Sequence, residues 1–281
     1  MGWQRFEAPV DDGAIVGYVR GTGPRVLLVH GGPGLSGEYL EDLAAELWDA
    51  YEVAWYQQRG LTPSIEAGPF TVDQHVRDLA AVLDALAWPD AWLVGHSWGG
   101  HLVVAAAVVL PGRVQGVVPV DPLGSAGDGG DAEFEAAMLE RTSPDDRERA
   151  RLLDERALSG EGTPQDALES IRLFWPAYYA EPAAAPPMPA IRLSVDAYAD
   201  TFASIIDGRA ALEAALPSIR LPVHLVHGSA SPMPLSASTD TAALIPGATV
   251  DVIDGAGHFI WHERPGAVRT VLDRVTSATP L

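Results

Sequence analysis

Ser97 is the residue whose sequence neighbours best suit it to act as a nucleophile. It is the central residue of Gly95-His-Ser-Trp-Gly99, with an apolar segment at 92–94 before it and a helix-forming segment at 101–110 after it. A Gly-x-Ser-x-Gly motif between a strand and a helix forms a sharp turn that holds the serine hydroxyl above the sheet. The motif glycines are needed because a Cβ atom there would collide with neighbouring backbone. We therefore predict that Ser97 is a catalytic nucleophile.

A serine nucleophile needs a base, and His258 is the best candidate. It lies in the loop 254–259, directly after the last predicted strand at 249–253. The carboxyl ends of parallel strands meet at one edge of a sheet, which is also where the Ser97 turn points. His262, four residues later, is the fallback. The remaining histidines of helices and strands are expected to have packing or surface roles: His75, His96, His101, His224 and His227.

An oxyanion hole requires two backbone N–H groups aimed at the developing negative charge. The first is expected from Trp98, the residue after the nucleophile. The second is expected from Gly32, in the turn His30-Gly-Gly-Pro-Gly34 that follows the first buried strand. The same sequence is also typical of an ordinary tight turn between a strand and a helix, and both interpretations can hold together.

The predicted elements place these residues on one sheet. Apolar strands alternate with amphipathic helices, which predicts an α/β fold with a doubly wound, mostly parallel sheet. An antiparallel hairpin is expected over 5–20, and Thr71 is expected to cap a helix at 71–86. The other expected elements are strands at 25–30, 53–56, 114–120, 223–227 and 249–253, and helices at 234–244 and 266–275.

The alternation stops between residues 123 and 219, which predicts a helical cap inserted in a core domain made of residues 1–122 and 220–281. Within the cap, the segment 133–158 is strongly charged and is expected to be helical. An aromatic cluster follows, and it either lines an apolar substrate pocket or packs the cap against the core. Its members are Phe174, Trp175, Tyr178 and Tyr179.

Composition limits the classes of function. The formal net charge is −20, which disfavours binding to nucleic acids and anionic membranes. The chain has no cysteine and no spacing typical of a metal site, so we expect no bound metal. No apolar run approaches the ~18 residues of a membrane span, and no signal sequence is evident, so we expect a cytoplasmic protein. Its oligomeric state is left open.

Taken together, the motifs resemble those of α/β-hydrolase fold enzymes. The pair His30-Gly-Gly-Pro-Gly34 and Gly95-His-Ser-Trp-Gly-Gly100 is similar to the proline iminopeptidase branch. The resemblance covers the sheet domain in the family's chain order and extends only loosely to the cap. It implies hydrolysis of peptides, amides or esters without a metal or organic cofactor. Gln57-Gln-Arg-Gly60 replaces the branch's usual Asp-Gln-Arg-Gly, a change for which we expect a structural consequence only.

The position of the catalytic acid departs from the family pattern. The resemblance implies an aspartate soon after the strand that follows the cap, but Ser231 stands there. Asp121 is the physical candidate, because it ends the strand after the nucleophile helix and so lies at the same sheet edge. Some family branches, including certain haloalkane dehalogenases and lactone hydrolases, take their acid from that position. The alternatives are that Asp121 only forms a turn before Pro122, or that Asp254 is the acid.

The sequence thus predicts a serine hydrolase with a Ser97-His258-Asp121 triad and an acyl-enzyme intermediate. The substrate is expected to be an ester, lactone or amide of a small molecule or short peptide. An aminopeptidase is one alternative, in which cap carboxylates such as Glu135 or Glu181 hold a free amine. A non-catalytic protein that binds a small molecule in the cap pocket is the other. We also expect Asp121→Asn to abolish turnover and Ser231→Ala to have little effect.

Overall fold

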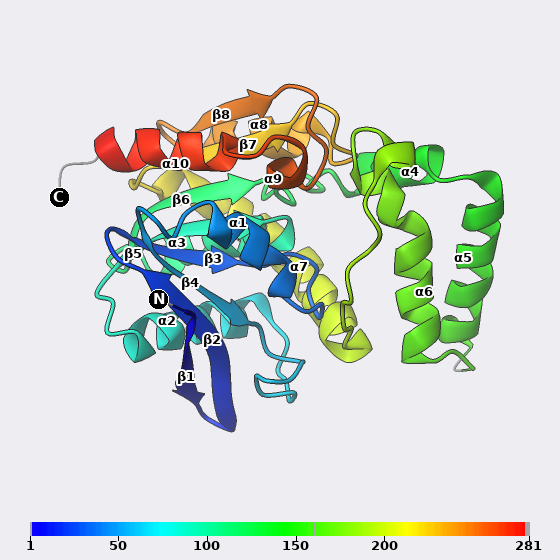
Figure 1. Ribbon diagram of the computed structural model, residues 1–281, viewed down its shortest axis with the longest axis horizontal. Coiled ribbons are helices and arrows are strands. Elements are labelled where there is room, and N and C mark those ends of the chain that lie inside the picture. The colour runs from blue at the N-terminus through cyan, green and yellow to red at the C-terminus, as the bar shows by residue number, and fades with distance from the viewer. Residues whose placement is uncertain (1, 160, 279–281) are drawn as a thin grey trace.

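An eight-stranded sheet runs through the computed structural model, which describes residues 2–159 and 161–278 (Figure 1). Residues 1 and 279–281 of the predicted core domain lie outside this description. The strands are β1 (Gln4–Val10), β2 (Gly13–Gly21), β3 (Arg25–Val29), β4 (Glu52–Gln57), β5 (Ala91–His96), β6 (Val114–Val120), β7 (His224–Gly228) and β8 (Thr249–Ile253). Their spatial order is β1-β2-β4-β3-β5-β6-β7-β8.

Most of this sheet is parallel. β1 pairs with β2 and β2 pairs with β4 in antiparallel fashion, so the predicted hairpin is present at one edge. All pairs from β4 through β3, β5, β6 and β7 to β8 are parallel. The predicted α/β class with a mostly parallel sheet is confirmed.

Helices cover both faces of the sheet, because side chains alternate between the two faces along each strand. In β3, Leu27 and Val29 belong to an apolar core with α2, α3 and α8, whereas Val26 and Leu28 belong to a second core with α1, α9 and α10. Thr71 caps α2 as predicted, since its hydroxyl accepts a hydrogen bond from the backbone N–H of Gln74. These core helices are α1 (Glu41–Ala45), α2 (Val72–Ala85), α3 (Trp98–Val109), α8 (Leu235–Leu244), α9 (Ile260–Glu263) and α10 (Ala267–Ala278), with short 3-10 turns η1 (Glu38–Leu40) and η4 (Leu216–Ser218).

A helical segment separates β6 from β7. It contains α4 (Asp131–Arg141), α5 (Pro144–Leu158), α6 (Pro164–Phe174), η2 (Trp175–Tyr178), η3 (Pro182–Ala184) and α7 (Val195–Ala215). Figure 1 shows α5 and α6 side by side at one end of the molecule, away from the sheet, while α7 returns to pack against α2 and α3. We call α4 to α7 the cap; its limits at residues 123 and 219 stay a prediction.

The charged segment 133–158 is helical, as expected, but it is divided into α4 and α5. Thr142 has extended backbone angles and ends α4. Pro144 then occupies the first position of α5, where a proline is tolerated because no backbone N–H is needed. The break turns α5 so that it runs alongside α6.

Candidate active site

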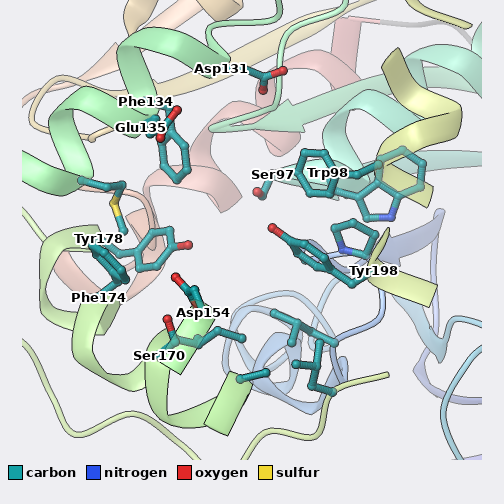
Figure 2. A pocket seen from close by; sticks show the side chains of 18 of the residues that line it. Ser97, Trp98, Asp131, Phe134, Glu135, Asp154, Ser170, Phe174, Tyr178 and Tyr198 are labelled. Atoms are coloured by element: carbon teal, nitrogen blue, oxygen red, sulfur yellow. The ribbon is translucent and has the colours of Figure 1, made fainter. Parts of the chain in front are cut away.

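Ser97 links β5 to α3 in a strained backbone conformation, with φ 56° and ψ −121°. Its backbone N–H donates to the Val120 carbonyl over 3.0 Å, and its carbonyl accepts from the Leu123 N–H over 3.1 Å. A Cβ atom on Gly95 would lie 2.1 Å from the carbonyl oxygen of Gly99, so no larger residue fits there. The hydroxyl of Ser97 points into a cavity between the sheet and the cap (Figure 2).

Asp121 follows β6 with a positive φ of 43° and is fully buried. Its Oδ1 accepts a hydrogen bond from the Gly228 backbone N–H at 3.0 Å. Its Oδ2 accepts from the Ser231 hydroxyl and from Nδ1 of His258, each at 2.5 Å. A buried carboxylate is costly unless such donors compensate it. Ser231, at the position where the family resemblance implied an acid, therefore supports Asp121 directly.

His258 is held at both its side chain and its main chain. Nδ1 carries the proton that is donated to Asp121, which leaves the lone pair on Nε2. The backbone N–H of His258 donates to the carbonyl of Tyr178 over 2.8 Å, joining the base to the cap. Within residues 2–159 and 161–278, neither the Ser97 hydroxyl nor His258 Nε2 makes a hydrogen bond. Catalytic hydrogen bonds are often long before substrate binds.

The alternative base and acid lie elsewhere. His262 Nδ1 is 3.0 Å from the hydroxyl of Tyr179, on the side of the loop that faces the cap–core contact. The carboxylate of Asp254 is 3.4 Å from the Ser229 hydroxyl, and the partner of His258 Nδ1 is Asp121.

The two predicted oxyanion donors border the same cavity as Ser97. Trp98 is the first residue of α3, so its backbone N–H has no helical acceptor and lies at the positive end of the helix. Gly32 has φ 56° in the turn after β3. The preceding Gly31 is so close to Ser97 that a Cβ atom on the glycine would lie 2.7 Å from Cβ of the serine. The turn therefore lies directly beside Ser97.

The cavity has a volume of about 700 Å³ and a mostly apolar lining. Phe174 and Tyr178 from the predicted aromatic cluster belong to this lining. The hydroxyls of Tyr178 and Tyr198 point into the cavity (Figure 2). Burial, and then the neighbouring Tyr198, raises the pKa of Tyr178, so its hydroxyl stays a neutral donor. The other apolar residues of the lining include Leu35, Leu123, Phe134, Met138, Ile171, Leu193, Phe202 and Met233.

Trp175 and Tyr179 lie outside this lining, which corrects the pocket interpretation of the cluster for these two residues. Trp175 packs against Phe259 with ring centroids 4.8 Å apart, and its indole N–H donates to the Pro186 carbonyl. Tyr179 stacks on the same Phe259 ring, with centroids 5.5 Å apart. Aromatic residues at successive positions of a tight 3-10 turn point in different directions, so the cluster is shared between pocket and cap–core contact.

Charged side chains border the cavity along α4 and α5. Asp131 pairs with Arg209, and Arg151 pairs with Glu155. Glu135 and Asp154 also border the cavity, yet neither carboxylate makes an ion pair with another described residue. In the same described ranges, no group of three or more histidine or acidic side chains is arranged to hold a metal ion, and no helix is long and apolar enough to cross a bilayer.

Three further polar residues support the site and were given no role there from the sequence. The Gln58 side-chain oxygen accepts from the Trp98 indole N–H at 2.9 Å, and its amide donates to the His30 carbonyl at 2.8 Å. Tyr39 and His96 form a part-buried hydrogen-bonded pair at 2.9 Å. Burial, followed by the nearby His258, lowers the pKa of His96 well below its usual range. Only Gln58 carried a signal, through its place in the 57–60 motif.

Comparison with known proteins agrees with this geometry. A family model described as the alpha/beta hydrolase fold matches residues 24–265. The 2-(acetamidomethylene)succinate hydrolase of Mesorhizobium japonicum is 36% identical over 116 residues, 40% of this chain and 41% of that protein. The proline iminopeptidase of Heyndrickxia coagulans is 34% identical over 109 residues, 38% of each chain. These matches span about two fifths of the relatives' length.

Solved structures resemble the whole chain. The 2-hydroxy-6-oxo-6-phenylhexa-2,4-dienoate hydrolase of Rhodococcus sp. strain RHA1 superposes with a TM-score of 0.74 and 21% identity, and the match covers 99% of both chains. At this level of identity the similarity concerns the fold.

Proposed function

The chain belongs to the α/β-hydrolase fold family, as its motifs indicated, and on this premise we propose that it is a serine hydrolase. Its substrate is an ester, lactone or amide of a small molecule or short peptide. The observation that carries the proposal is the hydrogen bond from His258 Nδ1 to the buried Asp121, at the sheet edge where the strained Ser97 faces a cavity.

In the first step, the Ser97 oxygen attacks the substrate carbonyl carbon while His258 Nε2 takes the hydroxyl proton. Asp121 keeps the Nδ1 proton in place and stabilises the imidazolium that forms. The backbone N–H groups of Gly32 and Trp98 stabilise the negative charge on the carbonyl oxygen. Collapse of the tetrahedral intermediate breaks the bond to the leaving group, which receives the proton from His258 and leaves an acyl-Ser97 ester.

Water then completes the cycle. His258 removes a proton from a water molecule, whose oxygen attacks the acyl carbon, and the bond to the Ser97 oxygen breaks as that oxygen is reprotonated. The mostly apolar cavity supports a substrate whose acyl or leaving group is largely apolar.

Fluorophosphonate labelling tests the proposal. We expect rapid modification of one site per chain, at Ser97, detected by intact mass and peptide mapping. The Ser97→Ala variant should not be labelled, and His258→Ala should react at a greatly reduced rate. An inert wild-type protein would contradict the proposal and favour the non-catalytic binding alternative. A panel of nitrophenyl esters, lactones and aminoacyl anilides then identifies the bond that is cleaved.

An aminopeptidase activity is the second candidate, favoured by the carboxylates of Glu135 and Asp154. Both border the cavity without an ion pair to a described residue, so they are available to a substrate ammonium group. The match to proline iminopeptidases also supports this candidate. Aminoacyl anilides with a free amine should then be cleaved faster than their N-acetyl forms, and Asp154→Asn should reduce that preference. Equal rates for both forms would contradict this candidate.

A further inference from the structure

A continuous chain of buried and part-buried hydrogen bonds joins the oxyanion turn to the loop of the proposed base. The backbone N–H of Gly31 donates to the Tyr39 hydroxyl over 2.6 Å. The same hydroxyl lies 2.9 Å from Nδ1 of His96, and Nε2 of His96 lies 3.0 Å from the carbonyl oxygen of His258. Because His96 directly precedes Ser97, this chain touches the three segments that carry the proposed chemistry.

The position of every proton in this chain follows from its ends. The His258 carbonyl can only accept, so His96 Nε2 must carry the ring proton and donate it. In a neutral imidazole, Nδ1 is then an acceptor, and the Tyr39 hydroxyl donates to it. The Tyr39 oxygen still has a lone pair for the Gly31 N–H. The donors and acceptors therefore match without any change of protonation.

Aromatic packing holds the side chains of Tyr39 and His96 in place. The His96 side chain is almost fully buried, and its ring centroid is 4.9 Å from that of Trp261 and 5.1 Å from that of Phe259. Tyr39 stacks on Trp261 at 6.2 Å and meets the edge of Phe259 at 5.8 Å. Neither ring can rotate far without breaking a hydrogen bond or displacing an aromatic neighbour.

We propose that Tyr39 and His96 are positioning residues that fix the base and the oxyanion turn relative to each other. This inference rests on the proposed serine hydrolase function. Asp121 orients the imidazole of His258 through its side chain, while His96 holds the same residue by its carbonyl. At the other end, Tyr39 fixes the Gly31 peptide, which directly precedes the proposed donor Gly32.

The consequence for catalysis is geometric. A displacement of about 1 Å between a catalytic group and its substrate can cost on the order of 100-fold in rate. The two loops follow separate strands, β3 and β8, so the covalent chain alone does not fix their relative position with such precision. The hydrogen bonds through Tyr39 and His96 connect both loops to the segment that carries Ser97. They affect the reacting arrangement more than the cavity that binds the substrate.

Steady-state kinetics of Tyr39→Phe test the proposal. The substitution keeps the ring and removes the hydroxyl with both of its hydrogen bonds, so we expect kcat to fall at least about tenfold, with KM changed less than about twofold. Tyr51→Phe is the matched control, because the Tyr51 hydroxyl also bonds to a partner, Asp273, but lies in the contact with α10. It should lower the stability while leaving kcat unchanged.

His96 variants test the same hydrogen-bond chain independently. They also provide the test if Tyr39→Phe does not fold. His96→Gln keeps an amide able to donate to the His258 carbonyl, whereas His96→Leu does not, so His96→Gln should retain a higher kcat. In the His96→Leu background, Tyr39→Phe should cause little further loss, because the chain is already broken.

The outcomes separate this inference from the proposed function. If wild-type Ser97 is not labelled by fluorophosphonate, the proposed function itself fails. If the wild type is labelled and turns over, but Tyr39→Phe has the wild-type kcat or only a raised KM, the positioning role is overturned. Equal kcat values for His96→Gln and His96→Leu, or fully multiplicative losses in the double variant, would also overturn it.

Discussion

His258 and Asp121 are 137 positions apart in the sequence, yet Nδ1 of the first lies 2.5 Å from Oδ2 of the second. The contact forms because both residues follow strands of one sheet and meet at its carboxyl edge. Among the described residues, Asp121 and Ser97 are two of the three non-glycine residues with positive φ, the third being Ala87. Strained backbone at both positions is typical of residues held for function and not for stability.

Asp121→Asn should reduce kcat by about 10⁴-fold, since an amide cannot stabilise the imidazolium and favours the wrong tautomer of His258. The Asn side chain is nearly isosteric, so folding should be retained, which circular dichroism can check. Steady-state hydrolysis of an activated ester measures the effect. A loss of less than about tenfold would show that another group serves as the acid.

Ser231→Ala should have a much smaller effect, on the order of three- to tenfold in kcat, about the net value of one ordinary hydrogen bond. We expected almost none from the sequence, but the Ser231 hydroxyl donates to the carboxylate that orients His258. Asp121 keeps its bonds from Gly228 and His258 in this variant. A larger loss for Ser231→Ala than for Asp121→Asn would contradict the assignment of the acid.

Exchange of the two side chains gives a sharper form of this test. Ser231→Asp alone places a second carboxylate beside Asp121, and like charges at that distance oppose each other, so activity should fall. In Asp121→Ser/Ser231→Asp a single carboxylate returns to the site from the neighbouring strand end. Part of the activity lost in Asp121→Asn should then be recovered. No recovery would indicate that the β6 position alone can orient His258.

The mostly parallel sheet and the placement of Ser97, His258 and Asp121 at its carboxyl edge were predictable, because strand endings follow from local patterns. Gly95-His-Ser-Trp-Gly99 determines its own turn, and the parallel topology then brings the strand ends together. The contact between Asp121 and Ser231 was not predictable, since it depends on the exact height at which β7 ends beside β6.

Side-chain contacts between residues far apart in the sequence could not be predicted, for the same reason. Tyr39 and His96 are 57 residues apart, and nothing local indicates that their side chains meet. The direction of Trp175 and Tyr179 depends on where η2 docks on Phe259. The charged segment of α4 and α5 shows a helix pattern, but its register against α6 is a tertiary property.

The size of the cavity predicts a preference for longer apolar acyl groups. Each added CH₂ that is buried contributes about 0.8 kcal/mol, so kcat/KM for nitrophenyl esters should rise about fourfold per carbon until the space is filled. Ile171→Trp, which reduces the cavity from α6, should shift the optimum to shorter chains. Ile206→Trp is the matched control, because Ile206 is 59% exposed and outside the lining. The same optimum in all three proteins would argue that substrate binds elsewhere.

Buried histidines should make the protein less stable as the pH falls. Burial is the first cause that lowers the pKa values of His30, His75 and His101 to about 4, from 6.5 in the unfolded chain. Between pH 6.5 and 4 the unfolded state therefore binds more protons than the folded state. The free energy of unfolding should decrease by up to about 1.4 kcal/mol per pH unit for each of these histidines, and well above pH 6.5 this contribution should be constant.

Urea unfolding between pH 7.5 and 5.5 measures this slope while most carboxylates stay ionised. The His101→Gln variant removes one of these titrating groups, so its slope should be smaller, by up to about 1.4 kcal/mol per pH unit, as the pH falls below 6.5. The amide can still donate to the Gly124 carbonyl that His101 contacts at 3.2 Å, which limits the loss of stability at neutral pH. An unchanged slope in this variant would mean that His101 takes up its proton in the folded protein as readily as in the unfolded chain.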